Sequence, residues 1–159
     1  MSFTTFPANV SDEILREWVY EWIDLLAAGE FDKAAVQLYP EVIPNNGSIS
    51  AVKYPVWTGE LMERVIGYGG IPEPVTPDDP RFARVIPIEN SFREEFERRF
   101  TIDHRTYEIF PKKYLGDIHL DLPLELGSFR GVGDLTAQFR LKDLGDGQLA
   151  IVLEDIHIL

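Results

Sequence analysis

The regular alternation of apolar and polar residues in the last third of the chain constrains its fold most strongly. In "DIHLDLPLEL", residues 117–126, aliphatic residues occupy every second position, and Asp117, His119 and Asp121 stand between them. "DLTAQFRLKDL", residues 134–144, repeats the pattern. A period of two is typical of antiparallel strands with one buried face, and "GDG" at 145–147 indicates a hairpin turn into a final strand. We therefore expect an antiparallel sheet whose second face is solvated.

The first third has the period of an amphipathic helix instead. Ser11 is a good N-cap, and Asp12 and Glu13 follow it where the helix dipole favours acids. Apolar residues then recur at helical spacing and predict a wide buried face. A second, shorter helix is expected in "EFDKAAVQLY", residues 30–39, because Pro40 cannot continue it.

Two further helices are expected in the middle of the chain. Thr58 is a candidate cap for "GELMERVIGYG", residues 59–69. "NSFREEFERRF", residues 90–100, predicts another helix with Asn90 or Ser91 as its cap. An apolar stripe at positions i, i+4 and i+8 runs along that helix and consists of Phe92, Phe96 and Phe100.

Helices first and strands last predict an α+β fold. We expect a single domain, residues 1–159, in which N-terminal helices pack on a curved, mainly antiparallel sheet formed largely by the C-terminal third. A short strand is expected near Ser48–Tyr54. The proline-rich segment 71–80, "IPEPVTPDDP", predicts a loop that covers either a pocket or the sheet edge.

The charge balance limits the classes of partner. Twenty-seven acids against 15 bases give a net charge of −12, which phosphate backbones repel, so we expect no nucleic-acid partner. An acidic surface suits either a basic protein partner or simple solubility. There is no cysteine, no secretory signal at the start and no apolar run of membrane-spanning length, so we expect a cytoplasmic protein.

The end of the chain, "QLAIVLEDIHIL", places an acid and a histidine in an aliphatic strand. With strict alternation, Asp155 and His157 share the face of Leu153 and project into a pocket, where a histidine held by an acid is a reasonable general base. With one β-bulge between Leu153 and Asp155, Ile156 and Ile158 rejoin the core and the two polar groups face water. The sequence leaves both registers open.

Asp117, His119 and Asp121 form a second polar set, at positions i, i+2 and i+4 of one strand face. Carboxylate and imidazole ligands together could hold a divalent metal ion. A solvated strand face with cross-strand pairs to Arg140 or Lys142 gives the same pattern, and we favour it. No phosphate loop, dinucleotide fingerprint or nucleophile elbow is present, so we expect no cofactor.

Aromatic residues supply the remaining candidates for a pocket. The set that could line one consists of Trp18, Trp22, Tyr54 and Trp57. The alternative is that Trp18 and Trp22 are core residues of the first helix.

The order of elements resembles the nuclear-transport-factor-two-like superfamily, also called SnoaL-like or cystatin-like. The resemblance is carried by "WIDLLAAGEFDKAA", residues 22–35, and by the closing hairpin "LTAQFRLKDLGDGQLAIVLEDIHIL", residues 135–159. It implies an α+β cone and a bacterial member of a group that includes isomerases, dehydratases, ligand-binding proteins, dimerisation modules and immunity proteins. Fold alone does not choose among these roles.

We therefore expect a small binding protein, of accessory or immunity type, that presents an acidic surface to a basic protein. One alternative is a protein that binds a small apolar ligand, or a SnoaL-like enzyme with Asp155 and His157 in its pocket. Another is a homodimer formed through the sheet face, without pocket chemistry.

Overall fold

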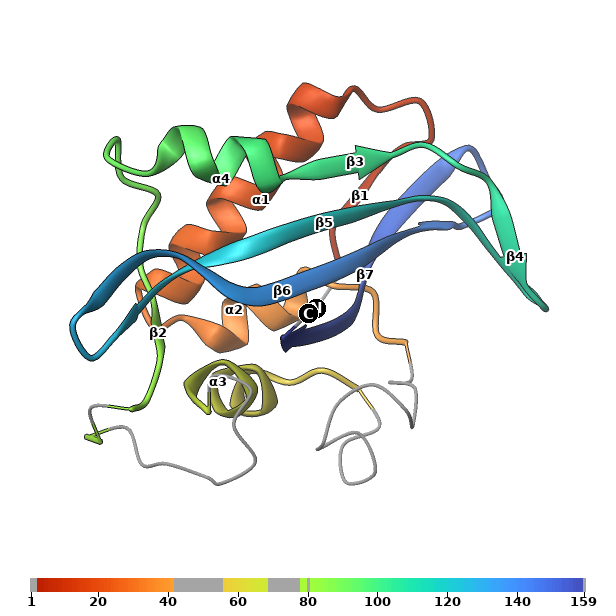
Figure 1. Cartoon of the computed structure of the whole chain (residues 1–159). Coiled ribbons are helices and arrows are strands. Elements are labelled where there is room, and N and C mark those ends of the chain that lie inside the picture. Colours follow the sequence, from red (N-terminus) through yellow and green to blue (C-terminus); the bar gives the residue numbers. More distant parts are fainter. Residues whose placement is uncertain (1–2, 42–55, 69–77, 80, 159) are drawn as a thin grey trace.

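The computed structural model describes residues 3–41, 56–68, 78, 79 and 81–158. Its helices are α1 (Asp12–Ala27), α2 (Phe31–Val36), α3 (Gly59–Gly67) and α4 (Arg93–Arg99). Its strands are β1 (Thr5–Pro7), β2 (Arg84–Val85), β3 (Thr101–Asp103), β4 (Tyr107–Ile109), β5 (Lys112–Leu126), β6 (Phe129–Asp143) and β7 (Gln148–Ile158). The α+β class expected from the sequence is confirmed, since the C-terminal strands form much of the sheet (Figure 1).

The sheet is antiparallel at every pairing among the described residues. Its strand order is β1-β7-β6-β5-β2, and β3 and β4 also pair with β5. Because β6 occupies one edge of β5, the three short strands share its other edge, one after another. The two 15-residue strands β5 and β6 therefore form the centre of the sheet, and every other described strand pairs with one of them or with β7.

The core lies between α1 and one face of this sheet (Figure 1). The rings of Trp18 and Trp22 stack 6.1 Å apart, and both meet Phe139 of β6 edge-on. The apolar residues at alternate positions from Ile118 to Leu124 and from Leu135 to Leu141 point to this face, as the period of two predicted. The core members from β5 and β6 are Ile118, Leu120, Leu122, Leu124, Val132, Leu135, Ala137, Phe139 and Leu141.

Helix starts follow the expected caps in two cases. The Ser11 hydroxyl accepts a hydrogen bond from the Ile14 amide at 3.2 Å, and the Thr58 hydroxyl accepts one from Leu61 at 3.1 Å. Each side chain satisfies one of the amides that the first turn of a helix leaves unpaired.

The expected start of the fourth helix was wrong. α4 begins at Arg93, its N-cap position is Phe92, and no side chain caps it. Phe92 is buried in the core, so packing fixes this end of the helix. The Asn90 side chain is used differently, because its oxygen accepts a hydrogen bond from Nε of Arg93 at 3.4 Å.

Several short strands were not expected, since strands of two or three residues are too short to show a period. The strand expected near Ser48–Tyr54 lies outside the described residues, and so does most of the proline-rich segment 71–80. Within the part of the chain that the structure describes, no helix is both long enough and apolar enough to cross a membrane.

Candidate functional site

The exposed side of α1 carries a row of acids. Glu13, Glu17, Glu21 and Asp24 are all exposed, and we call them the acidic ridge. At 3.6 residues per turn, the four positions fall within about 80° of the helix circumference. Among the described residues, none forms an ion pair with any of them. The ridge is therefore a continuous strip of uncompensated negative charge along the helix.

This arrangement does not favour the stability of α1 itself. Glu13, Glu17 and Glu21 are spaced i, i+4, and like charges at that spacing repel. Asp24 lies in the last turn, where the helix dipole favours cations, and that turn contains no basic residue. The Glu13 carboxylate alone is well placed for the dipole, since it lies in the first turn.

An open hollow of about 620 Å³ follows the same side of the helix, and its lining includes Glu13, Arg16, Glu17, Tyr20 and Glu21. Arg16 and Tyr20 are held on one side by α4, because Glu97 pairs with the Arg16 guanidinium at 3.3 Å and accepts a hydrogen bond from the Tyr20 hydroxyl. Burial, followed by the contact with Glu97, raises the pKa of Tyr20. The hollow thus offers carboxylates and a protonated phenol beside the Arg16 guanidinium, whose charge is already paired with Glu97, so a further cationic side chain suits it.

The last strand contains a β-bulge, which is one of the two registers that the sequence allowed. Phe139 of β6 faces Leu153, but its neighbour Gln138 faces Asp155, so Glu154 is the extra residue. Leu153 and Ile156 are both in the core, and Asp155 and His157 consequently lie on the outer face of the sheet, opposite α1. The side chain of Ile158 lies outside the described residues.

Asp155 is nevertheless buried on that outer face. One carboxylate oxygen accepts a hydrogen bond from the Ile156 amide at 2.9 Å, and the other lies 3.4 Å from Nδ1 of His157. Burial raises the pKa of Asp155, while the amide and His157 act in the opposite direction. The pair therefore exists, but it faces away from Trp18 and Trp22, so these four residues do not line a common pocket.

Asp117, His119 and Asp121 share the outer face of β5 as expected, but each has a different environment. Asp117 accepts a hydrogen bond from the Tyr107 hydroxyl at 2.6 Å, and Asp121 accepts one from the Thr136 hydroxyl at 2.6 Å. His119 is exposed. Across the part of the chain that is described, no group of three acidic or histidine side chains is arranged to hold a metal ion.

The aromatic candidates are likewise separated. Trp18 and Trp22 are buried core residues, and Nε1 of Trp22 donates a hydrogen bond to the Ala34 carbonyl at 3.2 Å. Trp57 is buried just before α3. Tyr54 lies outside the described residues.

A charged network on the outer face of the sheet was not predicted from the sequence. The Arg140 guanidinium donates to Glu154 at 2.5 Å and lies 5.2 Å from the centre of the Tyr114 ring. The Tyr114 hydroxyl donates to Glu41 at 2.5 Å, and Lys142 pairs with the same carboxylate at 3.2 Å. Burial and the bond to Glu41 together raise the pKa of Tyr114 to about 12. The phenol stays protonated at neutral pH, so the network is suited to holding strands together rather than to accepting a proton.

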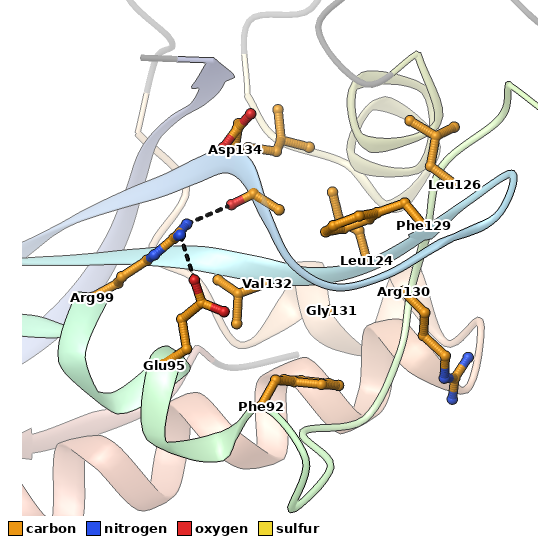
Figure 2. Close-up of a pocket in the computed structure, with 12 residues that line it drawn as sticks. Phe92, Glu95, Arg99, Leu124, Leu126, Phe129, Arg130, Gly131, Val132 and Asp134 are labelled. Carbon is orange, nitrogen blue, oxygen red and sulfur yellow. Dashed lines mark hydrogen bonds and ion pairs between the residues drawn. The ribbon is translucent and has the colours of Figure 1, made fainter.

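A second hollow lies between α4 and the turn that joins β5 to β6 (Figure 2). This α4 groove has a volume of about 530 Å³ and an apolar wall formed by Phe92, Leu124, Leu126, Phe129, Val132 and Leu135. Arg99 closes one side, where it bonds to Glu95 at 2.6 Å and to the Gly133 carbonyl at 3.3 Å (Figure 2). The sequence could not show this groove, because it depends on how the hairpin and α4 pack.

Comparison with known proteins adds no family: no family model, curated protein or solved structure matches the chain. The likeness to the nuclear-transport-factor-two-like superfamily therefore stays a prediction from the order of elements.

Proposed function

We propose that the protein is a binding module, of accessory or immunity type and acting in the cytoplasm, whose acidic ridge contacts a basic protein partner. The observation that carries this proposal is the row of four exposed carboxylates on α1, none of which forms an ion pair with a described residue. A surface of this kind costs the isolated helix stability and gains its compensation only when a cation approaches.

The rest of the molecule reinforces the ridge. With a net charge of −12, the field of the whole chain attracts a basic protein before contact and accelerates association. The hollow beside the ridge then offers Tyr20 and three carboxylates to one cationic side chain, because the Arg16 guanidinium in its lining is paired with Glu97. Lysine or arginine fits there, since both place a charge at the end of an apolar stem.

The environments of the titratable groups favour binding over catalysis. The Asp155 carboxylate already accepts a hydrogen bond from the Ile156 amide. Burial and the bond to Glu41 raise the pKa of Tyr114, so its phenol stays protonated. Asp117 and Asp121 each accept a hydrogen bond from a neighbouring hydroxyl. These groups are arranged to satisfy one another rather than to converge on a substrate.

The proposal is tested by capture of partners from a host lysate with three versions of the immobilised chain. They are the unaltered protein, the ridge variant Glu17→Gln/Glu21→Gln, and the control variant Glu63→Gln/Asp146→Asn. The control removes the same number of charges from exposed positions on α3 and in the β6–β7 turn. We expect the unaltered and control proteins to capture the same basic protein, and the ridge variant to lose it.

Salt supplies a second criterion. At about 1 M salt the Debye length falls to about 3 Å, so capture by the ridge should disappear. A partner that the ridge variant retains, or one that binds equally at high salt, would contradict the proposal.

A further inference from the structure

The hairpin formed by β4 and β5 ends in an apolar tip. Phe110 is 89% exposed and Ile109 is 47% exposed, and Pro111 completes the tip. Figure 1 shows this hairpin extending from the molecule at the far right. A protruding apolar side chain of this size, next to a second one, is typical of a surface that is covered when the protein associates.

The same hairpin is basic in an otherwise acidic chain. Residues 105–113 contain Arg105, Lys112 and Lys113 against the single acid Glu108. The two lysines reach Glu41 and Asp143 only at 3.7 and 3.9 Å, and both are about half exposed. The tip therefore combines an apolar end with positive charge directly behind it.

The α4 groove has the complementary properties. It is walled by apolar side chains, and Phe129 is 47% exposed beside it. Four carboxylates lie in or next to the groove (Glu89, Glu95, Glu125 and Asp134), against the guanidiniums of Arg99 and Arg130. No described residue forms an ion pair with Asp134. The groove can therefore receive an apolar group that is followed by cations.

The tip cannot reach the groove of its own chain. It precedes the first residue of β5, whereas the groove lies at the last residues of that 15-residue strand. At about 3.3 Å per residue the two ends are about 45 Å apart. Figure 1 shows the two hairpins at opposite sides of the molecule. An occupant from this protein must come from another copy.

We propose that copies of the chain associate head to tail, with the tip Ile109, Phe110 and Pro111 of one copy in the α4 groove of the next. Lys112 and Lys113 then face the carboxylates beside the groove. A head-to-tail contact leaves one free tip and one free groove, so association continues until a ring closes or a filament grows. This contact does not use the acidic ridge and is independent of the function proposed above.

The test uses two variants that each disable one side of the contact. Phe110→Ser removes the tip, and Phe129→Ser removes the exposed side of the groove. Ile14→Ser is the control, because Ile14 is 48% exposed on α1, outside both surfaces. Far-ultraviolet circular dichroism and thermal melting establish that all three variants fold like the unaltered chain.

Sedimentation velocity over a range of concentrations should show masses above one chain for the unaltered protein and for Ile14→Ser. Each contact variant alone should remain a monomer. An equimolar mixture of the two should give a dimer and nothing larger, since only one intact tip and one intact groove meet. Lys112→Glu/Lys113→Glu should weaken self-association about tenfold or more at low salt.

Three results would overturn the proposal. The unaltered chain could remain monomeric at the highest concentration reached. The mixture of Phe110→Ser and Phe129→Ser could fail to form a dimer, which is the result expected if copies associate tip to tip or through the sheet face. Phe110 could instead be needed for binding to phosphatidylserine vesicles by a chain that stays monomeric.

Discussion

At the scale of single residues, Asp155 is the clearest case in which one extra residue in a strand decides the face and the environment of a side chain. The bulge at Glu154 turns Asp155 onto the outer face, where the residue is still only 8% exposed. Because its pKa is raised by burial, the folded state binds its proton more tightly than the unfolded state does. The ionised carboxylate therefore costs stability above the raised pKa, and this cost is absent below the unfolded value of 3.8.

We expect Asp155→Asn to melt at a higher temperature than the unaltered chain at pH 7, since the amide oxygen can still accept the Ile156 hydrogen bond. The difference should shrink as the pH falls and vanish below pH 3.8. Melting curves at several pH values measure it, with Asp146→Asn as an exposed control. A difference that grows on acidification would mean that the carboxylate stabilises the fold through His157.

Gly67 is a residue whose lack of a side chain is required by packing. A Cβ atom at this position would lie 2.1 Å from the Phe82 ring, and the Gly67 carbonyl accepts a hydrogen bond from Ala83 at 2.8 Å. Gly67→Ala should therefore destabilise the protein by about 1–3 kcal/mol through overpacking. Urea unfolding measures the loss, and adding Phe82→Leu should recover part of it. Equal stability of Gly67→Ala and the unaltered chain would contradict the close packing.

At the scale of elements, the caps and the long alternating strands could be predicted from sequence because both are local signals. Ser11 and Thr58 lie directly before the helices they cap, and β5, β6 and β7 are long enough to show their period. The start of α4 could not be predicted from the candidate caps Asn90 and Ser91, because neither caps the helix. Burial of Phe92 in the core fixes this end instead. The bulge in β7 could be proposed but not chosen, since either register leaves an aliphatic residue for the core.

The acidic ridge gives a prediction for α1. Glu17→Gln/Glu21→Gln removes the repulsion between Glu13 and Glu17, between Glu17 and Glu21, and between Glu21 and Asp24. These pairs cost about 0.2–0.5 kcal/mol each, so the variant should be more stable by about 1 kcal/mol. That gain raises the melting temperature by about 2–4 °C for a chain of this size.

The control for this prediction is Glu63→Gln/Asp146→Asn, which should leave the melting temperature nearly unchanged because its two positions are not neighbours on one helix face. Should the ridge variant melt at a lower temperature than the unaltered chain, the four acids would stabilise α1 by themselves, which contradicts a ridge that needs a partner.

At the scale of the whole molecule, candidate sites were harder to predict than the fold. Negative charge was visible in the composition, but its concentration on one side of α1 follows only from the helical spacing of Glu13, Glu17 and Glu21. The α4 groove and the hairpin tip are formed by segments that pack or protrude in three dimensions. No local sequence pattern predicts them. Asp155 and His157 could be picked out from the sequence, because they are polar residues in an otherwise aliphatic strand.

The distribution of charge over the whole chain also separates two kinds of contact. The ridge is purely acidic and suits a basic partner, whereas the tip is apolar with cations behind it and suits an apolar groove with Asp134 at its side, whose carboxylate forms no ion pair with a described residue. Self-association and partner binding can therefore occur at the same time, since they use opposite charges on different elements. Loss of one through its own variants should leave the other intact.

The most direct test of the central claim is the association rate constant between this protein and its captured basic partner, measured by stopped flow at several salt concentrations. For the unaltered chain the rate constant should fall steeply as salt rises. For Glu17→Gln/Glu21→Gln it should be lower at low salt, and the two should converge near about 1 M. Identical rate constants for both proteins at low salt would contradict the claim that the ridge guides and binds the partner.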